Sequence, residues 1–378
     1  MQPRQLVLRD FRNVEEGALD LDHRFTVLHG ENGAGKTNVL EALYLVATLR
    51  SFRCSELGPL IRRGVGEGRV ELAGHDPHLD LSTRLQVHLV QGERSTRRVA
   101  IADGKVVRAA ADFYGRARAI LFTPEDLGVL RGSPGGRRNF VDRVLFGRER
   151  AHIADVQAYE KALRSRNHVL RGEMPRTTRE HLLETYESAL AATGGRIWSR
   201  RQALVDDLGP SFVAIFSQIH GASLTPSVTY QSRLGALPPT EREQGLADAL
   251  ARRRGDDLIR GTTTVGPHRD DLEMRLDGQP VGTFASQGQT RALILAFKIA
   301  EVRAARDQSG EPPLLLLDDV SSELDPQRNA QLFQALTEDA GRCVLTTTAP
   351  EFIRLGGAAE ARHVEVSAGT LRSVTKPT

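Results

Sequence analysis

Residues 30–37 decide the fold: they read Gly30-Glu31-Asn32-Gly33-Ala34-Gly35-Lys36-Thr37 and fit the G-x-x-x-x-G-K-[ST] phosphate loop. Glycines at these positions let successive backbone N–H groups converge on a phosphate. The lysine reaches the β- and γ-phosphates, and the threonine hydroxyl can ligate Mg²⁺. Apolar runs predict a buried strand at residues 25–28 and a helix at residues 38–45, so the loop joins a strand to a helix. A glycine-rich surface turn is the alternative, but this context favours a site for a nucleoside triphosphate.

The composition is that of a globular protein with more than one lobe. The chain has 378 residues and a formal net charge of +3, which permits a polyanionic partner without requiring one. Its two cysteines, Cys54 and Cys343, stand far apart, which excludes a disulfide framework and fits a reducing compartment. Neither a membrane-spanning apolar run nor a signal-peptide core is present, so we expect a cytoplasmic protein that does not enter a membrane.

The spacing of apolar residues changes from strand-like to helical at about residue 123. Two long amphipathic helices are expected between about 150 and 210, joined near residues 172–178. A third helix begins at Thr240 with a capping-box pattern. The middle of the chain is therefore predicted to be mainly helical.

Strand-like pieces return at residues 262–265 and 272–276. We therefore expect an α/β nucleotide-binding lobe built from both ends of the chain, residues 1–123 and 263–378. A mainly helical lobe, residues 124–262, is inserted between them.

Two carboxylates follow a buried strand. Apolar runs predict strands at residues 314–317 and 343–346, and Asp318 and Asp319 come directly after the first. A strand of this kind delivers a carboxylate to the sheet edge where nucleotide sites lie. Asp318 is placed to hold Mg²⁺ and Asp319 to polarise the attacking water. Acids at such positions also cap helices, but the phosphate loop in the same chain favours the catalytic interpretation.

Ser286-Gln287-Gly288-Gln289 leads into an apolar helix that starts near Thr290. A serine hydroxyl and a glycine N–H at a helix N-terminus can bind an anion, with the helix dipole behind it. Taken alone the motif is an ordinary N-cap. Its position upstream of the Leu-rich strand and the aspartate pair favours a phosphate contact.

The order of these motifs resembles that of the ABC-type ATPases, in which the S-x-G-Q element of one subunit completes the ATP site of another. The aspartate pair is followed by Ser322-Glu323-Leu324-Asp325, as in that superfamily. Residues 124–142 and 316–325 are similar to the two signatures of the RecF family, SMC-like DNA-repair ATPases without a long coiled coil. The resemblance implies an α/β, ABC-type P-loop ATPase lobe with a mixed sheet, similar to an SMC head, plus an inserted helical lobe.

The resemblance also implies roles for individual residues. Thr37 and Asp318 would hold Mg²⁺, and Lys36, Glu125 and Asp319 would serve catalysis. Asp325 would contact a partner subunit in an ATP-dependent homodimer. The residues expected at ATP are Arg12, Asn13, Gly30, Glu31, Asn32, Gly33, Ala34, Gly35, Lys36, Thr37, Asn38, Ser286, Gln287, Gly288, Gln289 and Asp325.

Three positions depart from the broader superfamily. Glu125 stands where transporters and SMC heads carry a glutamine that senses the γ-phosphate. Thr346-Thr347-Thr348 occupies the place of the switch histidine, which Thr347 or Thr348 could replace. Asp319 at the usual glutamate position places a shorter carboxylate farther from the water. We therefore hypothesise a slow, DNA-stimulated ATPase that acts as a timer.

Arginine clusters suggest contact with DNA, although clusters on helices are more often solvated faces. No sequence-reading module is present, so the clusters favour contact with the backbone of double-stranded or gapped DNA. The resemblance implies recombinational repair within the SOS response and the loading of RecA together with RecR and RecO. The clusters comprise Arg137, Arg138, Arg164, Arg166, Arg171, Arg196, Arg200, Arg201, Arg252, Arg253 and Arg254.

Two other functions stay open from the sequence. A membrane transporter's ATPase subunit shares the phosphate loop and the S-x-G-Q motif. The absent switch histidine, the long span from Thr37 to Ser286 and the 124–142 block argue against it. A DNA-bridging scaffold that binds ATP without useful hydrolysis differs from a timer only in its kinetics.

Overall fold

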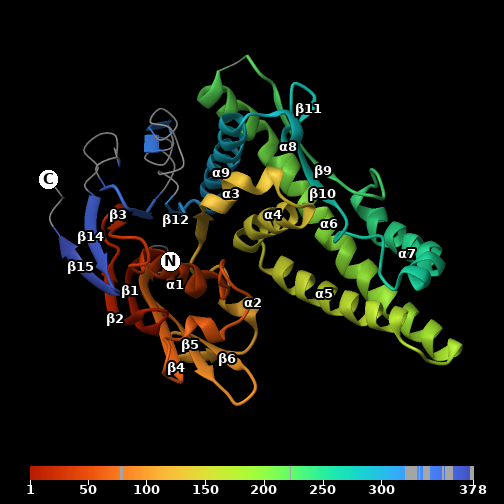
Figure 1. The fold of residues 1–378 in the computed structure, drawn as a ribbon, viewed down its shortest axis with the longest axis horizontal. Helices are drawn as coiled ribbons and strands as arrows, with labels where there is room; N and C mark the ends of the chain where they lie inside the picture. The colour runs from red at the N-terminus through yellow and green to blue at the C-terminus, as the bar shows by residue number, and fades with distance from the viewer. Residues whose placement is uncertain are drawn as a thin grey trace. The chain divides into compact units, whose positions relative to one another are not determined.

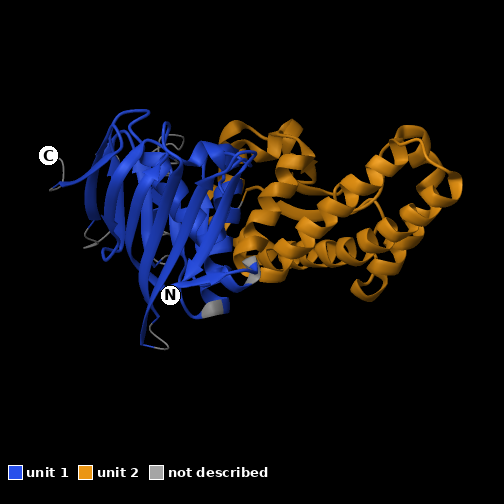
Figure 2. Cartoon of the chain, turned by 90° about the horizontal axis from the view of Figure 1, so that it is seen from below, with its two compact units in different colours: residues 1–127, 294–378 blue, residues 128–293 orange. Residues whose placement is uncertain are grey.

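The computed structural model describes residues 1–76, 80–221, 223–319, 330–331, 333–334, 341–350, 353 and 361–374. The chain forms two compact units (Figure 2), unit 1 from residues 1–127 and 294–378 and unit 2 from residues 128–293. The lobe limits expected from the sequence stay a prediction, since the units divide after residues 127 and 293.

The first sheet of unit 1 is antiparallel, with the order β2-β1-β4-β5-β6-β7. Its strands alternate between buried apolar and exposed residues, as Leu6 and Leu8 do in β1, so one face is apolar. The strands are β1 (Gln2–Phe11), β2 (Val14–Asp20), β4 (Glu67–Asp76), β5 (Leu81–Gln91), β6 (Thr96–Ala102) and β7 (Lys105–Val107).

The second sheet of unit 1 is mixed, with the order β15-β14-β3-β13-β12-β8, and among the described strands only β15 runs antiparallel to its neighbour. Its central strands are apolar without alternation because parallel sheets are covered on both faces. The strands expected at 25–28, 314–317 and 343–346 are confirmed. The strands are β3 (Phe25–His29), β8 (Ala119–Phe122), β12 (Leu314–Asp318), β13 (Cys343–Thr347), β14 (Ala361–Ser367) and β15 (Thr370–Val374).

Helix α1 (Lys36–Thr48) contacts strands of both sheets and is buried on nearly all sides (Figure 1). Two short helices complete the described part of this unit's first segment, α2 (Ala110–Phe113) and α3 (Pro124–Gly128). The core of unit 1 therefore lies around α1, directly behind the phosphate loop.

Unit 2 is built on an antiparallel pair of long helices, α5 (Arg150–Arg171) and α6 (Arg176–His220) (Figure 1). This pair confirms the two helices expected from the sequence. The third expected helix is α7 (Arg242–Arg260), which packs on both. The other helices described here are α4 (Pro134–Arg148), α8 (Val281–Phe284) and α9 (Gln287–Ser309), the last of which continues into unit 1.

A small antiparallel sheet of order β11-β10-β9 completes unit 2. The strand expected at 272–276 is confirmed within β10 (Asp271–Leu276), which pairs with β9 (Pro226–Gln231) and β11 (Gln279–Pro280). The strand expected at 262–265 is wrong, because these residues form a loop. Their β-branched side chains suggested a strand, but the hydroxyls of Thr263 and Thr264 bind Asn167 and Asp257 instead.

In the described part of the chain, no helix is both long and apolar enough to cross a membrane.

Candidate nucleotide-binding site

The phosphate loop, residues 30–37, turns sharply between β3 and α1. Gly30 and Gly35 have φ angles of +150° and +118°, which L side chains rarely adopt. A Cβ atom on Gly30 would lie 2.2 Å from the carbonyl oxygen of Val366, and one on Gly35 would lie 2.8 Å from Oδ1 of Asn13. Both backbone conformations favour glycine, and at Gly30 a side chain would also clash with the backbone of Val366.

Lys36 lies inside the curl of the loop. Its Nζ atom donates hydrogen bonds to the carbonyl oxygens of Gly30 at 2.7 Å and Glu31 at 2.9 Å. Burial lowers the pKa of Lys36, and the carboxylates of Asp318 and Asp319 oppose this shift. The loop is thus held around a cation that can exchange carbonyl oxygens for phosphate oxygens.

Thr37 and Asp318 meet although 281 residues separate them. The Thr37 hydroxyl donates to Oδ1 of Asp318 at 2.8 Å, and the Thr346 hydroxyl donates to the same oxygen at 2.9 Å. Burial raises the pKa of Asp318, and these two hydrogen bonds oppose the shift. The two residues expected to hold Mg²⁺ are therefore adjacent.

The aspartate after Asp318 leaves the strand at once. Asp319 has a φ angle of +47°, and its N–H donates to the Thr346 hydroxyl at 2.9 Å. Thr346 thus fixes both carboxylate-bearing residues. The sequence did not identify Thr346 and instead suggested Thr347 or Thr348 as the replacement for the switch histidine. In the structure the Thr347 hydroxyl accepts a hydrogen bond from the Ala349 N–H, and Thr348 is exposed.

Glu125 is exposed near the start of α3, just after β8. Its negative charge contributes to the raised pKa of Asp318, so the two carboxylates are electrostatically coupled. β8 is the parallel neighbour of β12, and the carboxyl ends of parallel strands meet at one sheet edge. β3, β8, β12 and β13 accordingly bring the phosphate loop, Glu125, the aspartate pair and the threonines together.

Asn13 supports the phosphate loop from behind. Its Nδ2 atom donates to the Ala34 carbonyl at 3.0 Å, and its Oδ1 atom accepts from Nδ2 of Asn38 at 2.7 Å. The N–H of Gly369, in the β14–β15 turn, donates to the same Ala34 carbonyl at 2.8 Å. The first turn of the chain and the last hairpin therefore both fix the loop.

Arg12 is engaged by a buried carboxylate. Its guanidinium donates to Oε2 and Oε1 of Glu41 at 2.8 and 2.7 Å, and also to the Pro59 carbonyl. Arg53 approaches the same carboxylate at 3.6 Å. A nucleotide contact by Arg12 stays a prediction. The structure shows that Arg12 links the end of β1 to α1 through Glu41.

The S-x-G-Q motif forms a reciprocal cap at the start of α9. The Gln289 N–H donates to the Ser286 hydroxyl at 3.1 Å, and the Ser286 N–H donates to Oε1 of Gln289 at 2.7 Å. Ser286 and Gln287 are exposed, and Gly288 is half-buried. The helix N-terminus is therefore open to solvent. Asp325, the other residue expected at a partner's ATP, lies outside the described residues, as do residues 322–324.

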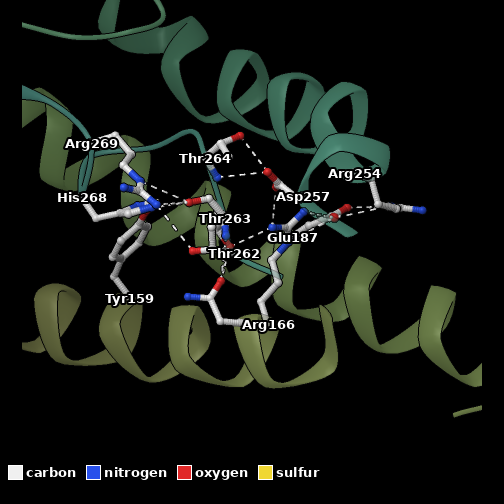
Figure 3. A network of polar contacts seen from close by, with 11 residues as sticks. Tyr159, Arg166, Glu187, Arg254, Asp257, Thr262, Thr263, Thr264, His268 and Arg269 are labelled. Atoms are coloured by element: carbon white, nitrogen blue, oxygen red, sulfur yellow. Dashed lines mark hydrogen bonds and ion pairs between the residues drawn. The ribbon is translucent and has the colours of Figure 1, made fainter. Parts of the chain in front are cut away.

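Several arginines expected on solvated or DNA-facing surfaces instead bind carboxylates within unit 2 (Figure 3). Arg166 is fully buried and binds Oδ2 of Asp257 at 2.8 Å and Oε1 of Glu187 at 2.9 Å. Arg254 binds the other Glu187 oxygen at 2.6 Å. These guanidinium groups hold α5, α6 and α7 together and cannot bind DNA without breaking that network.

Arg201 forms a second internal pair. It binds both carboxylate oxygens of Asp142, at 2.8 and 2.7 Å, and the Pro267 carbonyl. Burial acts to raise the pKa of Asp142, but Arg201 and His152 lower it to about 2. Arg196 and Arg200 both bind Asp155, and Arg137 binds Asp271. Much of the basic charge of unit 2 is thus structural.

Comparisons with known proteins agree with the motif order. The model of the RecF/RecN/SMC N terminal domain family matches residues 4–359. The DNA replication and repair protein RecF of Myxococcus xanthus is 39% identical over 371 residues, covering 96% of this chain and 95% of that protein. The Geobacter sulfurreducens protein of the same name is 36% identical over 375 residues, with 98% and 99% covered.

Solved structures show the same fold. The recombination mediator protein RecF in its ATP form superimposes with a TM-score of 0.85 at 24% identity, covering 99% of this chain and 98% of that chain. The Smc head domain of Pyrococcus furiosus gives a TM-score of 0.55 at 14% identity, with 99% and 96% covered. The expected fold is confirmed: an α/β, ABC-type lobe with a mixed sheet, similar to an SMC head, plus a mainly helical insertion.

Proposed function

The chain belongs to the RecF family, and from that premise we propose that it is an ATP-controlled DNA-binding protein of recombinational repair. The main support for the proposal is the hydrogen bond from the Thr37 hydroxyl to Asp318. It places the phosphate loop next to a carboxylate that could bind Mg²⁺.

ATP and Mg²⁺ fit the residues at this sheet edge. The backbone N–H groups of residues 30–37 and the Lys36 ammonium would hold the phosphates, and Thr37 and Asp318 would hold the cation. Bound Mg²⁺ neutralises phosphate charge and orients the phosphate oxygens. Burial raises the pKa of Asp318, and a divalent cation would stabilise this buried carboxylate in its charged form. Asp319 would orient the water.

We expect ATP to drive head-to-head dimerisation on DNA, with slow hydrolysis releasing it. The exposed N-terminus of α9 supports this, since Ser286 and Gln287 lie uncovered on one subunit and could close on a partner's ATP. Assistance to RecA loading at single-strand gaps, with RecR and RecO, and a cytoplasmic location are proposed from family membership alone.

Ser286→Arg is expected to leave ATP binding within about twofold of wild type and to prevent ATP-dependent dimerisation. The larger cation would fill the space that a partner's phosphates need, whereas the phosphate loop lies on another element. Light scattering with ATP and Mg²⁺ measures the mass. Ser227→Arg, which changes an exposed serine on β9 by the same charge, is the control. A Ser286→Arg variant that still doubles its mass with ATP refutes the dimer.

Turnover is expected to stay below about 1 s⁻¹, at the low end of enzyme rates, and to rise with protein concentration and with DNA. Asp319→Asn should lower turnover by roughly 10²-fold by removing the base, with ATP affinity retained. Phosphate release at several protein concentrations tests both. A rate that is independent of protein concentration contradicts the timer, and hydrolysis that is unlinked to release from DNA favours the bridging scaffold.

A further inference from the structure

One group of arginines in unit 2 is not neutralised internally. Whereas Arg166, Arg201 and Arg254 bind buried carboxylates, another set surrounds a cavity of about 580 Å³ beside α7. We refer to this hollow as the arginine cavity. Its basic side chains are Arg233, Arg252, Arg253 and Arg260.

The arginine cavity has a strong excess of positive charge. Asp256 is the single carboxylate among its described lining residues, and it binds Arg253 at 3.0 Å in an exposed pair. Within the described chain, the side chains of the other three arginines make no hydrogen bond or ion pair. Like charges gathered around one hollow repel each other, so an anion is the natural complement of this site.

The rim of the arginine cavity is held rigidly by the buried network below it. On α7, Arg252, Asp256 and Arg260 recur every four residues and share one face. Thr264 also lines the cavity, and its N–H and hydroxyl donate to Oδ1 of Asp257 at 3.1 and 2.7 Å (Figure 3). Asp257 is in turn fixed by Arg166, so the backbone on both sides of the hollow is anchored.

The segment of the cavity lining that contains Arg233 and Leu234 is also held by a buried residue. The Arg233 N–H donates to Oδ1 of Asp270 at 3.2 Å, and Asp270 is buried beneath the Tyr230 hydroxyl, which donates to it at 2.8 Å. The guanidinium groups are exposed while the backbone that carries them is fixed. Such preorganisation lowers the entropic cost of binding.

We propose that the arginine cavity is a contact site for the sugar-phosphate backbone of nucleic acid, with Arg233, Arg252 and Arg260 as phosphate ligands. Guanidinium forks match phosphate oxygens in a bidentate manner. The described lining contains no Asn, Gln or aromatic residue that could read or stack on a base, so the contact is independent of sequence. This inference rests on the proposed DNA-binding function and adds where the DNA lies.

The test is binding of a DNA duplex by the full chain with ATP and Mg²⁺ across a salt series. Arg252→Gln/Arg260→Gln should weaken binding by roughly tenfold or more, and should reduce the slope of log K against log salt by roughly 1–2. The control Arg84→Gln/Arg176→Gln removes the same charge from arginines that are 61% and 89% exposed on β5 and α6. It should bind within about twofold of wild type with an unchanged slope.

Asp256→Asn is expected to strengthen DNA binding. A misfolded variant would bind DNA more weakly, so misfolding cannot explain this result. Removing the carboxylate releases Arg253 and should tighten binding by roughly 2–5-fold. Suppose that wild-type binding depends steeply on salt and that all three variants bind DNA as tightly as wild type. The arginine cavity then serves another partner, and the inference fails while the proposed function stands. If wild-type binding is absent or insensitive to salt, the DNA-binding function itself fails.

Discussion

Lys36→Met is expected to weaken ATP binding by at least about 10²-fold. The ammonium makes two hydrogen bonds that shape the phosphate loop, and in the complex these would be replaced by bonds to phosphate oxygens. Hydrogen bonds to charged groups contribute roughly 1.5–3 kcal/mol each, so losing two of them corresponds to about 10²–10⁴-fold in affinity. Methionine has a similar length but no donor, and it leaves Asp318 and Asp319 without their nearby cation.

Titration with a fluorescent ATP analogue measures this effect directly. Lys105→Met is the matched control, because Lys105 is exposed on β7 of the same unit and its replacement removes the same charge. It should bind the analogue as wild type does. An affinity for Lys36→Met within about threefold of wild type would show that residues 30–37 are not the phosphate site.

Arg166→Met is expected to lower the free energy of unfolding of unit 2 by about 3–5 kcal/mol. The substitution removes the ion pair between Arg166 and the buried Asp257 and leaves Glu187 paired with Arg254 alone, and breaking one side of a buried ion pair has that typical cost. Asp257 also orders the 262–264 loop through Thr264, so the loss should spread beyond the cavity left by the side chain.

Trp198 offers a local readout, because it is the single tryptophan of the chain and lies buried on α6. Urea unfolding followed by its fluorescence reports on unit 2. Arg164→Met, two residues earlier on α5 and 73% exposed, should change the unfolding free energy by less than about 0.5 kcal/mol. If both variants unfold at the same urea concentration, the buried network is not a determinant of stability.

The parts of the molecule that could be predicted from the sequence rest on local patterns. The phosphate loop, β3 and α1 are contiguous, and their order fixes their relation. Asp318 could be expected at the same sheet edge because it ends an apolar run, and parallel strands end together. Thr346 could not be selected among three threonines, since its position opposite Asp318 depends on the register of β12 and β13.

The environment of the arginines, in contrast, could not be predicted from local sequence patterns. Whether a guanidinium faces solvent, DNA or a carboxylate depends on residues far away in the sequence, such as the 91 residues between Arg166 and Asp257. Arg164 and Arg166 lie on different faces of α5 because residues two apart in a helix do not share a face, and one is 73% exposed while the other is fully buried. Only the packing of α5 against α6 and α7 supplies the carboxylates that Arg166 binds.

The strand order also determines when the protein can mature during its synthesis. β3 pairs with β13 and β14, and at 5–20 residues per second the roughly 300 residues in between take a ribosome about 15–60 s. Meanwhile β1, β2 and β4 to β7, and α5 with α6, find their partners nearby in the nascent chain. The apolar β3 has both edges unpaired throughout this interval, which exposes it to aggregation. Nascent chains should therefore depend on a chaperone until β13 and β14 emerge and close the sheet around the phosphate loop.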